Sequence, residues 1–452
     1  MACAYLDLIR IEKITLTVLF AILLPAALFL FQQTLSRTPQ IKSNVLSVLR
    51  YRDPRWLLLG QSTSRLGDGV ASVTLILLII DKWPGATHLS MYSATGTVAL
   101  VVFLLAGGVV VDRVSRKTLL LISDVTRAAI MATVAILVAT HHLTFIELLL
   151  STFLFGVLDA VFMPAATALM PEIVPEEVLP AANAASAISR SLFGGMLGPA
   201  LGGILSAWSL PGALAFDVAT FLVSAVTLIL MRPTPKPSTP EDGHENMLRS
   251  IATGLRYTFE TKWLFWTLIG AGLINAALFV PNGALMPLFL KQAFHANRQM
   301  IGLTFAISGI GWLLGSLVVG SLKTPKRRVR WLTASWMVAT VVVGAISVVN
   351  HIWLAILIAF LVGPLLSYGN VMWESMMQTE VPRDLLGRVS SVDWFMSLAL
   401  SPIGVMVAGA VSTHFGIRTY FFVAMITCLP IQIVLLISKR VNSVDATRVS
   451  EI

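Results

Sequence analysis

Long apolar stretches alternate with short polar segments along most of the chain, from residue 56 to residue 438. Many of these stretches reach the roughly 20 residues that an α-helix needs to cross about 30 Å of hydrocarbon. They lack the strict alternation of a strand, and only helices or closed barrels satisfy their backbone groups inside lipid. The pattern predicts membrane-spanning helices at 56–80, 90–111, 118–140, 145–170, 184–208, 211–231, 264–290, 300–322, 331–350, 352–377, 389–411 and 416–438.

The predicted helices form two sets of six that have nearly the same length, 56–231 and 264–438. A short string recurs at the matching place in each set, because 174–179 and 381–386 both precede a fifth helix. Parallel halves with weak internal similarity are typical of alternating-access transporters. We therefore expect an all-α membrane protein with 12 transmembrane helices in two six-helix bundles.

Three further segments complete the predicted organisation. After a proline-rich start at 232, apolar positions between 248 and 259 recur at helical spacing, which predicts an amphipathic helix on the membrane surface; a solvated linker is the alternative. An uncharged run at 14–31 predicts an extra N-terminal hydrophobic helix outside the transport core. The expected parts are an N-terminal extension (1–45), a first bundle (46–231), a cytoplasmic linker (232–263), a second bundle (264–438) and a cytoplasmic tail (439–452).

The charge distribution sets the orientation. The chain is 56% hydrophobic and only 12% charged, and 23 of its 32 Lys and Arg residues fall on one side of the predicted spans. The positive-inside rule makes that side cytoplasmic, together with the start of the first bundle, the linker and the C-terminus. The sequence thus predicts a multi-pass protein of the cell membrane, with the lipid bilayer as partner. The one-sided charge excludes nucleic acid.

Signals of enzymatic chemistry are missing from the sequence. Cys3 and Cys428 are too far apart to suggest a disulfide framework, and no Cys/His spacing fits a metal. No nucleotide-binding loop and no Ser/His/Asp constellation is recognisable. We therefore expect no enzyme, no cofactor and no metal. Without a nucleotide-binding loop, a proton gradient is the expected energy source. For the oligomeric state, the expectation is a monomer.

A charged string stands between the second and third predicted spans. Its pattern is Gly-x-x-x-Asp-Arg-x-Ser-Arg-Lys, and its fixed positions are Gly108, Asp112, Arg113, Arg116 and Lys117. It resembles the cytoplasmic loop signature of the major facilitator superfamily, except that the second glycine is Ser115. The resemblance implies the general transporter fold of that superfamily. We expect a gating loop in which Asp112 and the arginines latch the cytoplasmic side when the protein is open outward; turn stabilisation is the alternative.

The fifth predicted span carries a glycine-rich string with one proline. Its fixed positions are Gly194, Gly198, Pro199, Gly202 and Gly203. Glycines four apart let a neighbouring helix approach closely, and a proline bends the helix. The string resembles the fifth-helix motif of drug:proton antiporters, which implies export rather than import. The alternative is a close-packed, kinked helix with no directional meaning.

Three short segments resemble one particular group of transporters within the superfamily. The segments 59–68, 164–171 and 386–389 are similar to bacterial efflux permeases of the macrolide-exporter and enterobactin-exporter type. Thr167 and Asp159 depart from that pattern and leave the substrate open.

Ionisable side chains in mid-membrane normally face a cavity or a partner. Asp68 lies near the centre of span one with Arg65 on the same helix face, so the two form a self-compensating pair or Asp68 carries a proton when they separate. Asp159 has no same-face cation in its own helix, which predicts a protonated or water-exposed acid, with a hydrogen bond to a neighbouring helix as the alternative. Asp217 is expected to lie nearer to the membrane surface than Asp159 and to have a structural role.

Charges near the helix ends give further candidates. We expect Arg190 to pair with an acidic side chain or to reach the membrane surface, and Asp124 and Arg127 to support the gating loop. A boundary cluster of the second half consists of Glu374, Arg388 and Asp393, which either supply partners across the bundle interface or form a solvated cluster. Aromatic candidates for a substrate cavity, each with packing as the alternative, are Phe279, Phe305, Trp312, Trp373 and Trp394.

Together these features predict a secondary active transporter, a proton-coupled antiporter that exports amphipathic small molecules such as drugs, macrolides or siderophores by alternating access. The excess of acids over cations within the spans suits protons and neutral or cationic cargo. Two alternatives stay open: an importer or lipid flippase of the same fold, and a non-transporting sensor or assembly subunit.

The gating-loop hypothesis predicts that Asp112→Asn strongly reduces turnover, because an amide cannot form the ion pairs of the latch. The measurement is cargo flux in vesicles at matched expression. Wild-type turnover in this variant would exclude a required latch.

Overall fold

The computed structural model describes residues 46–175, 178–232, 247–321, 325, 327–382, 385–438 and 441–442. Regular structure within these ranges is entirely helical. The predicted extra helix at 14–31 lies outside them, as does most of the predicted tail.

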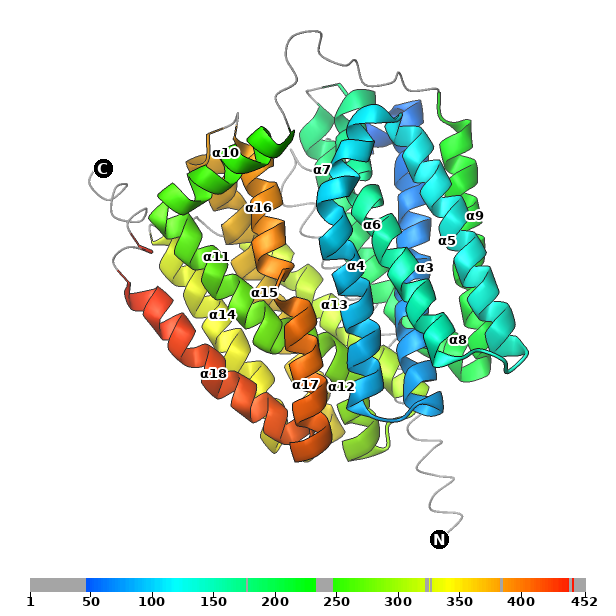
Figure 1. Ribbon diagram of the computed structural model, residues 1–452, viewed down its shortest axis with the longest axis vertical. Helices are drawn as coiled ribbons and strands as arrows, with labels where there is room; N and C mark the ends of the chain where they lie inside the picture. Colours follow the sequence, from blue (N-terminus) through cyan, green and yellow to red (C-terminus); the bar gives the residue numbers. More distant parts are fainter. Residues whose placement is uncertain are drawn as a thin grey trace.

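The first bundle is on the right in Figure 1 and the second on the left. The elements of the first are η1 (Leu46–Arg50), α3 (Arg52–Lys82), α4 (Ala86–Arg113), α5 (Arg116–Ala139), α6 (Phe145–Ile173), α7 (Leu179–Ser189), η3 (Arg190–Leu197), α8 (Gly198–Trp208) and α9 (Leu210–Leu230). Those of the second are α11 (Lys262–Ile274), η4 (Asn275–Phe279), α12 (Val280–Phe294), α13 (Arg298–Ser321), α14 (Arg328–Gly344), η5 (Ala345–Val348), α15 (Ile352–Glu380), α16 (Leu386–Leu398), α17 (Ser401–Phe415) and α18 (Ile417–Ile437). Between them in sequence, α10 (Met247–Glu260) falls where the amphipathic helix was expected and packs on α16.

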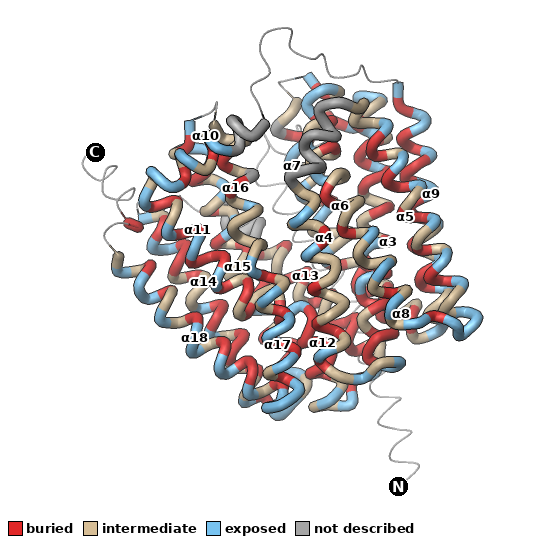
Figure 2. The backbone as a smooth tube through the Cα atoms, viewed as in Figure 1, coloured by how far each residue is buried: buried red, intermediate tan, exposed pale blue. Residues whose placement is uncertain are grey.

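Eleven helical stretches of the described chain are long and apolar enough to cross a membrane. They match eleven of the predicted spans, and α13 coincides with the remaining one at 300–322. The total of twelve spans stays a prediction. Large apolar side chains cover the outward faces of both bundles, such as Ile146 at 77% exposure and Trp208 at 78% (Figure 2). Apolar surface this extensive is typical of a protein that lipid surrounds.

Three spans are interrupted just before a proline. The π-helical segment η3 ends two residues before Pro199, η4 ends two residues before Pro281, and α16 and α17 separate just before Pro402. Proline lacks a backbone N–H and clashes with the preceding turn, so the helix widens or breaks there. The bend at Pro199 was expected from the sequence, whereas the π-helical geometry of η3 and η4 was not.

The two bundles meet most closely where α8 crosses α13 and α4 crosses α17. A Cβ on Gly203 would lie 2.6 Å from the Cα of Gly302, and a Cβ on Gly409 would lie 2.6 Å from the Cβ of Ser90. These contacts lie toward the ends of the helices remote from the α4–α5 connection, at the bottom of Figure 1. We call this end of the molecule the sealed end.

The glycine-rich string of span five packs against both bundles. Gly198 faces α3, where a Cβ would lie 2.8 Å from the Cα of Gly69, and Gly202 also packs against α3. Gly203 faces α13 of the other bundle. The string therefore holds span five against its own bundle and also forms part of the contact between the bundles.

This packing predicts that Gly198→Ala destabilises the fold by about 1–3 kcal/mol, because the new methyl group overpacks the contact with α3. Gly195→Ala is the matched control, since its nearest neighbour would be 3.9 Å away. The measurement is thermal unfolding of the purified protein in detergent. Equal stability of the two variants would contradict the assigned contact.

Candidate functional site

A cavity of about 320 Å³ lies inside the first bundle, between α3, α4, α5, α6 and α9. We call it the N-bundle cavity. Asp68, Asp159 and Asp217 all line it, so three acids that the sequence singled out on three different spans come together. The acids face a cavity rather than the lipid, as ionisable groups in a membrane protein should.

Arg127 of α5 is the principal cation beside this cavity. Its Nη2 forms an ion pair with Oδ1 of Asp159, and its side chain is only 2% exposed. The guanidinium also lies over the rings of Phe162, 4.4 Å from the centroid, and Phe221, 6.0 Å from the centroid. The interpretation of Asp159 as an unpaired acid was therefore wrong, because the preceding helix supplies a cation, whereas its side-chain exposure of 46% agrees with the expected access to water. The expectation that Arg127 supports the gating loop was also wrong, because its guanidinium pairs with Asp159 beside the N-bundle cavity.

The hydrogen bonds of Arg65 go to groups other than Asp68, although its charge lies within electrostatic range of that carboxylate. Its guanidinium donates to Gln61 Oε1 at 3.0 Å and to two groups of α7, the Ser189 hydroxyl at 3.1 Å and the Ser186 carbonyl at 3.2 Å. Within the described chain no ion pair joins Arg65 to Asp68. The expected self-compensating pair is replaced by a link between spans one and five, because the hydrogen-bonding groups of α7 lie within reach.

Two further carboxylates are fully buried. Asp217 accepts a long hydrogen bond from Thr220, 3.4 Å, and its Oδ2 has no partner among the described residues. Asp124 accepts from the Ser224 hydroxyl at 2.6 Å. Asp217 is thus deeper than expected and lines the cavity. Gly67 makes room for it, since a Cβ there would collide with the Asp217 carboxylate.

The gating-loop string is mostly helical. Only Val114 and Ser115 separate α4 from α5, and Ser115 has a φ of −52°, so no glycine is required at this position. Arg116 forms an ion pair with Glu172 at the end of α6, and Lys117 donates to the Met231 carbonyl at 2.6 Å. Both contacts are within the first bundle. The side chains of Gly108, Asp112 and Arg113 lie outside the described part, so the latch stays a prediction.

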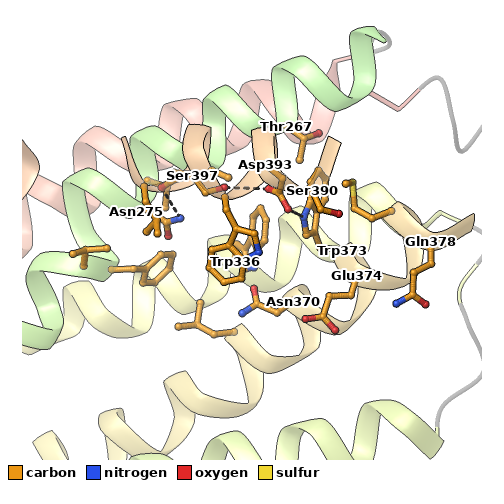
Figure 3. A pocket seen from close by; sticks show the side chains of 18 of the residues that line it. Thr267, Asn275, Trp336, Asn370, Trp373, Glu374, Gln378, Ser390, Asp393 and Ser397 are labelled. Atoms are coloured by element: carbon orange, nitrogen blue, oxygen red, sulfur yellow. Dashed lines mark hydrogen bonds between the residues drawn. The ribbon is translucent and has the colours of Figure 1, made fainter. Parts of the chain in front are cut away.

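A larger cavity, about 520 Å³, lies inside the second bundle between α11, η4, α13, α14, α15 and α16 (Figure 3). We call it the C-bundle cavity. Four of the five predicted aromatic residues line it, namely Phe279, Trp312, Trp373 and Trp394, whereas Phe305 lines a smaller one. Sequence reasoning missed Trp336, Asn370 and Gln378. Asn370 and Gln378 form a polar stripe with the predicted Glu374, since a spacing of four residues puts all three on one face of α15.

The three residues of the predicted boundary cluster do not lie together in the structure. Glu374 and Asp393 line the C-bundle cavity, where Asp393 Oδ2 accepts from Trp373 Nε1 at 2.9 Å and Oδ1 accepts from the Ser397 hydroxyl at 3.3 Å. Arg388 lies elsewhere, with its backbone packed against Gly254 of α10. Two of the three residues thus line one cavity, and the role expected for the cluster at the bundle interface stays a prediction.

Arg190 is exposed and forms no ion pair within the described part of the chain. This exposure agrees with the alternative that Arg190 reaches the membrane surface.

An ion-pair network that the sequence did not predict connects the bundles at the sealed end. Asp81 at the end of α3 pairs with Lys291 of α12 and with Nη2 of Arg298 in α13, the latter at 2.7 Å. Arg298 Nη1 also donates to the Ser206 carbonyl of α8 at 2.6 Å. All three charged residues come from different spans, so no local spacing could reveal the network. These contacts must break if the sealed end is to open.

The network predicts that Asp81→Asn loosens the sealed end. A cysteine replacing Ser90, which is buried against Gly409, reports on opening in a protein that lacks Cys3 and Cys428. We expect its maleimide labelling in the purified protein to accelerate on the order of two- to tenfold, since partly exposed ion pairs contribute about 0.2–1 kcal/mol each.

Glu260→Gln is the control for this experiment, because it removes the exposed Arg256–Glu260 pair within α10 and leaves the bundle contact intact. Equal labelling rates in Asp81→Asn and the control would show that the network does not hold the sealed end.

Comparisons with known proteins agree with this architecture. The chain resembles the macrolide efflux protein A of Streptococcus pyogenes, with 25% identity over 390 residues that cover 85% of this chain and 96% of the relative. It also resembles the multidrug efflux pump Tap of Mycolicibacterium fortuitum, with 26% identity over 407 residues that cover 86% and 96%.

Solved transporters share the fold at low sequence identity. The nucleoside transporter NupG matches with a TM-score of 0.68 at 12% identity, over 85% of this chain and 99% of that one. A bacterial homolog of the human lysosomal transporter Spinster, in an inward-facing and unoccupied conformation, matches with a TM-score of 0.69 at 13% identity, over 87% and 97%.

The family described as transmembrane secretion effector, MFS_3, matches residues 43–451, which is nearly the whole chain. The two-bundle fold, the cavity in each bundle and this match lead to one conclusion: the chain belongs to the transmembrane secretion effector family of major facilitator transporters and is a multi-pass membrane transporter, not an enzyme.

Proposed function

We propose that the protein is a proton-coupled exporter of amphipathic small molecules that works by alternating access in the bacterial cell membrane. The observation that carries the proposal is the cluster of acids in the N-bundle cavity, where Asp68, Asp159 and Asp217 face one another beside a single buried cation, Arg127.

The charge balance of this cluster is what suits it to proton coupling. Arg127 forms its ion pair with Asp159, and one cation offsets only one carboxylate. Asp68 lies within electrostatic range of two arginines, Arg127 and Arg65, and of two further acids, Asp159 and Asp124. Asp217 lies within range of Asp68 and Arg127, so four carboxylates share two cations. Ionising further carboxylates in such a site is costly, so binding a proton is the cheaper way to neutralise them. The cluster can therefore take up and release protons as its access to water changes.

The contacts between the bundles fit one end state of a transport cycle. The sealed end lies opposite the basic α4–α5 connection, which the positive-inside rule assigns to the cytoplasm. In this orientation the sealed end is the outer one, which is the arrangement expected of an inward-facing form. Opening it requires the Asp81 network to break and α8 and α4 to part from α13 and α17. A latch at Asp112 would then hold the opposite end.

The direction and the cargo class rest on likeness to relatives. Two efflux proteins match most of the chain, one of them for macrolides and one for several drugs by name. The glycine-rich string of span five, which resembles the motif of drug:proton antiporters, contacts both bundles in the structure. Export of an amphipathic small molecule in exchange for protons, by a monomer without a cofactor, accounts for these features together.

The proposal predicts that Asp68→Asn abolishes flux driven by a proton gradient, because an amide cannot gain and lose a proton. Exchange of labelled for unlabelled cargo, which needs no net proton movement, should persist. The measurement is cargo flux in proteoliposomes with and without an imposed pH difference, using tetraphenylphosphonium as cargo.

Asp53→Asn is the matched control, because Asp53 lies outside both cavities and accepts a hydrogen bond from the Arg232 backbone at 3.1 Å. Gradient-driven flux at the wild-type rate in Asp68→Asn would remove Asp68 from the mechanism. Net cargo flux in the import direction, opposite to the proposed export, would identify an importer or flippase. Absence of any flux in the wild type would favour a sensor or assembly subunit.

A further inference from the structure

We propose that the cytoplasmic ends of α3, α5 and α9 form a binding site for the headgroup of an anionic phospholipid. The site is separate from both cavities, and it does not depend on the direction or the cargo of transport.

The ends of these three helices meet at one place, at the upper right of Figure 1. Arg52 at the start of α3 donates from Nη2 to the Leu230 carbonyl at 3.3 Å. Lys117, near the start of α5, donates from Nζ to the next carbonyl, that of Met231, at 2.6 Å. Because neighbouring Cα atoms are only about 3.8 Å apart, two cations from different helices are held side by side at the end of α9.

More positive charge gathers around this pair. Three exposed arginines stand close to it in the same segments, with Arg50 just before α3, Arg55 in its first turn and Arg232 after the end of α9. The carboxylate that contacts this cluster is Asp53, and it accepts a hydrogen bond from the backbone N–H of Arg232 at 3.1 Å. None of the five cations forms an ion pair within the described chain. We call them the basic cluster, and its charge calls for an anion from outside the described chain.

The cations have hydrogen-bond donors to spare for a phosphate. An arginine carries five N–H donors and a lysine three, whereas Arg52 and Lys117 each form one hydrogen bond within the described chain. Charge-assisted hydrogen bonds to phosphate are stronger than neutral ones, and an arginine can bind a phosphate through two parallel N–H groups. Basic pockets between transmembrane helices on the cytoplasmic side are typical sites for anionic headgroups.

The neighbouring side chains place the basic cluster at the level of lipid headgroups. Tyr51 is 38% exposed, and the guanidinium of Arg55 lies 5.6 Å from the ring centroid of Trp56. Tyrosine and tryptophan are enriched at the membrane–water interface. Next to the cluster, the exposed apolar side chains of the packed helices α5 and α9 are Ile122, Val125, Val226, Ile229 and Leu230. A phospholipid can therefore place its phosphate on the cations and its acyl chains along α5 and α9.

The second bundle shows that these charges are not needed to cap a helix. Cations often bind the last carbonyls of a helix, so capping of α9 is the structural alternative for Arg52 and Lys117. The helix α18 ends the second bundle as α9 ends the first, and a neutral amide caps it. Asn442 Nδ2 donates to the Ser438 carbonyl at 2.8 Å and to the Leu436 carbonyl at 3.1 Å. The first bundle uses cations for the same task, and their charge remains to be explained.

The test is lipid binding to the purified, full-length and delipidated transporter, followed by native mass spectrometry. The probes are phosphatidylglycerol and phosphatidylcholine with the same acyl chains, so only the headgroup and its net charge differ. We expect the wild type to retain phosphatidylglycerol selectively. The double variant Arg52→Gln/Arg232→Gln should bind it on the order of 10- to 30-fold more weakly, because each cation near an anionic headgroup contributes about fivefold. The glutamine at position 52 keeps an amide that can still donate to the Leu230 carbonyl.

Lys262→Gln is the matched control. Lys262 is exposed, forms no ion pair within the described chain, and begins α11 of the second bundle as Arg52 begins α3 of the first. This variant should retain phosphatidylglycerol like the wild type. A second measurement is thermal stability, since the lipid should raise the melting temperature of the wild type and the control more than that of the double variant.

A single variant covers the case in which the double variant does not fold. The Arg232 side chain forms no hydrogen bond within the described chain, so Arg232→Gln leaves the capping of α9 intact. It should weaken phosphatidylglycerol binding about fivefold.

Three results would overturn the lipid site. The first is equal retention of both lipids by the wild type, and the second is wild-type affinity for phosphatidylglycerol in the Arg232→Gln and double variants. The third is an equal loss of binding in Lys262→Gln, which would show a general attraction of the basic side of the protein. Selective retention that the basic cluster variants lose and the control keeps would support the site.

Discussion

The cost of placing charge inside a membrane governs this structure. In the first bundle, Arg127 lowers that cost for one acid, because it pairs with Asp159 and lies over two phenylalanine rings. Asp68 and Asp217 line the same cavity and form no ion pair among the described residues. The hydrogen bonds of Arg65 go to Gln61 and to span five, so its charge acts on Asp68 only from a distance. An acid in this position has two ways to become neutral, to bind a proton or to meet a mobile cation, and both are useful to a transporter.

The same constraint explains how the bundles can be joined and still separate. Their contact combines close glycine packing, as at Gly203 and Gly302, apolar packing, as of Met196 against Ile310, and the ion-pair network around Asp81. Glycine contacts are tight but small, and ion pairs near water are weak, so neither is costly to break.

The sequence predicted the features that depend on periodicity and local spacing. Span positions, the bend at Pro199 and the close packing of Gly198 follow from patterns within one helix. It was wrong where a partner comes from another span, as for Arg65, Arg127 and Asp159, because helix-face geometry says nothing about neighbouring helices. Trp336 and the Asp81 network were missed for the same reason. The stripe from Asn370 to Gln378 was detectable, since its spacing of four residues is a local signal.

The central claim is that cargo binding is linked to proton release from the acids of the N-bundle cavity. The most direct measurement is proton release on binding of tetraphenylphosphonium to the purified protein in weakly buffered solution, followed with a pH indicator. The account predicts release that saturates with cargo binding and disappears when Asp68 and Asp217 are both replaced by asparagine. Cargo binding with no change in bound protons, at any pH at which the protein stays folded, would contradict it.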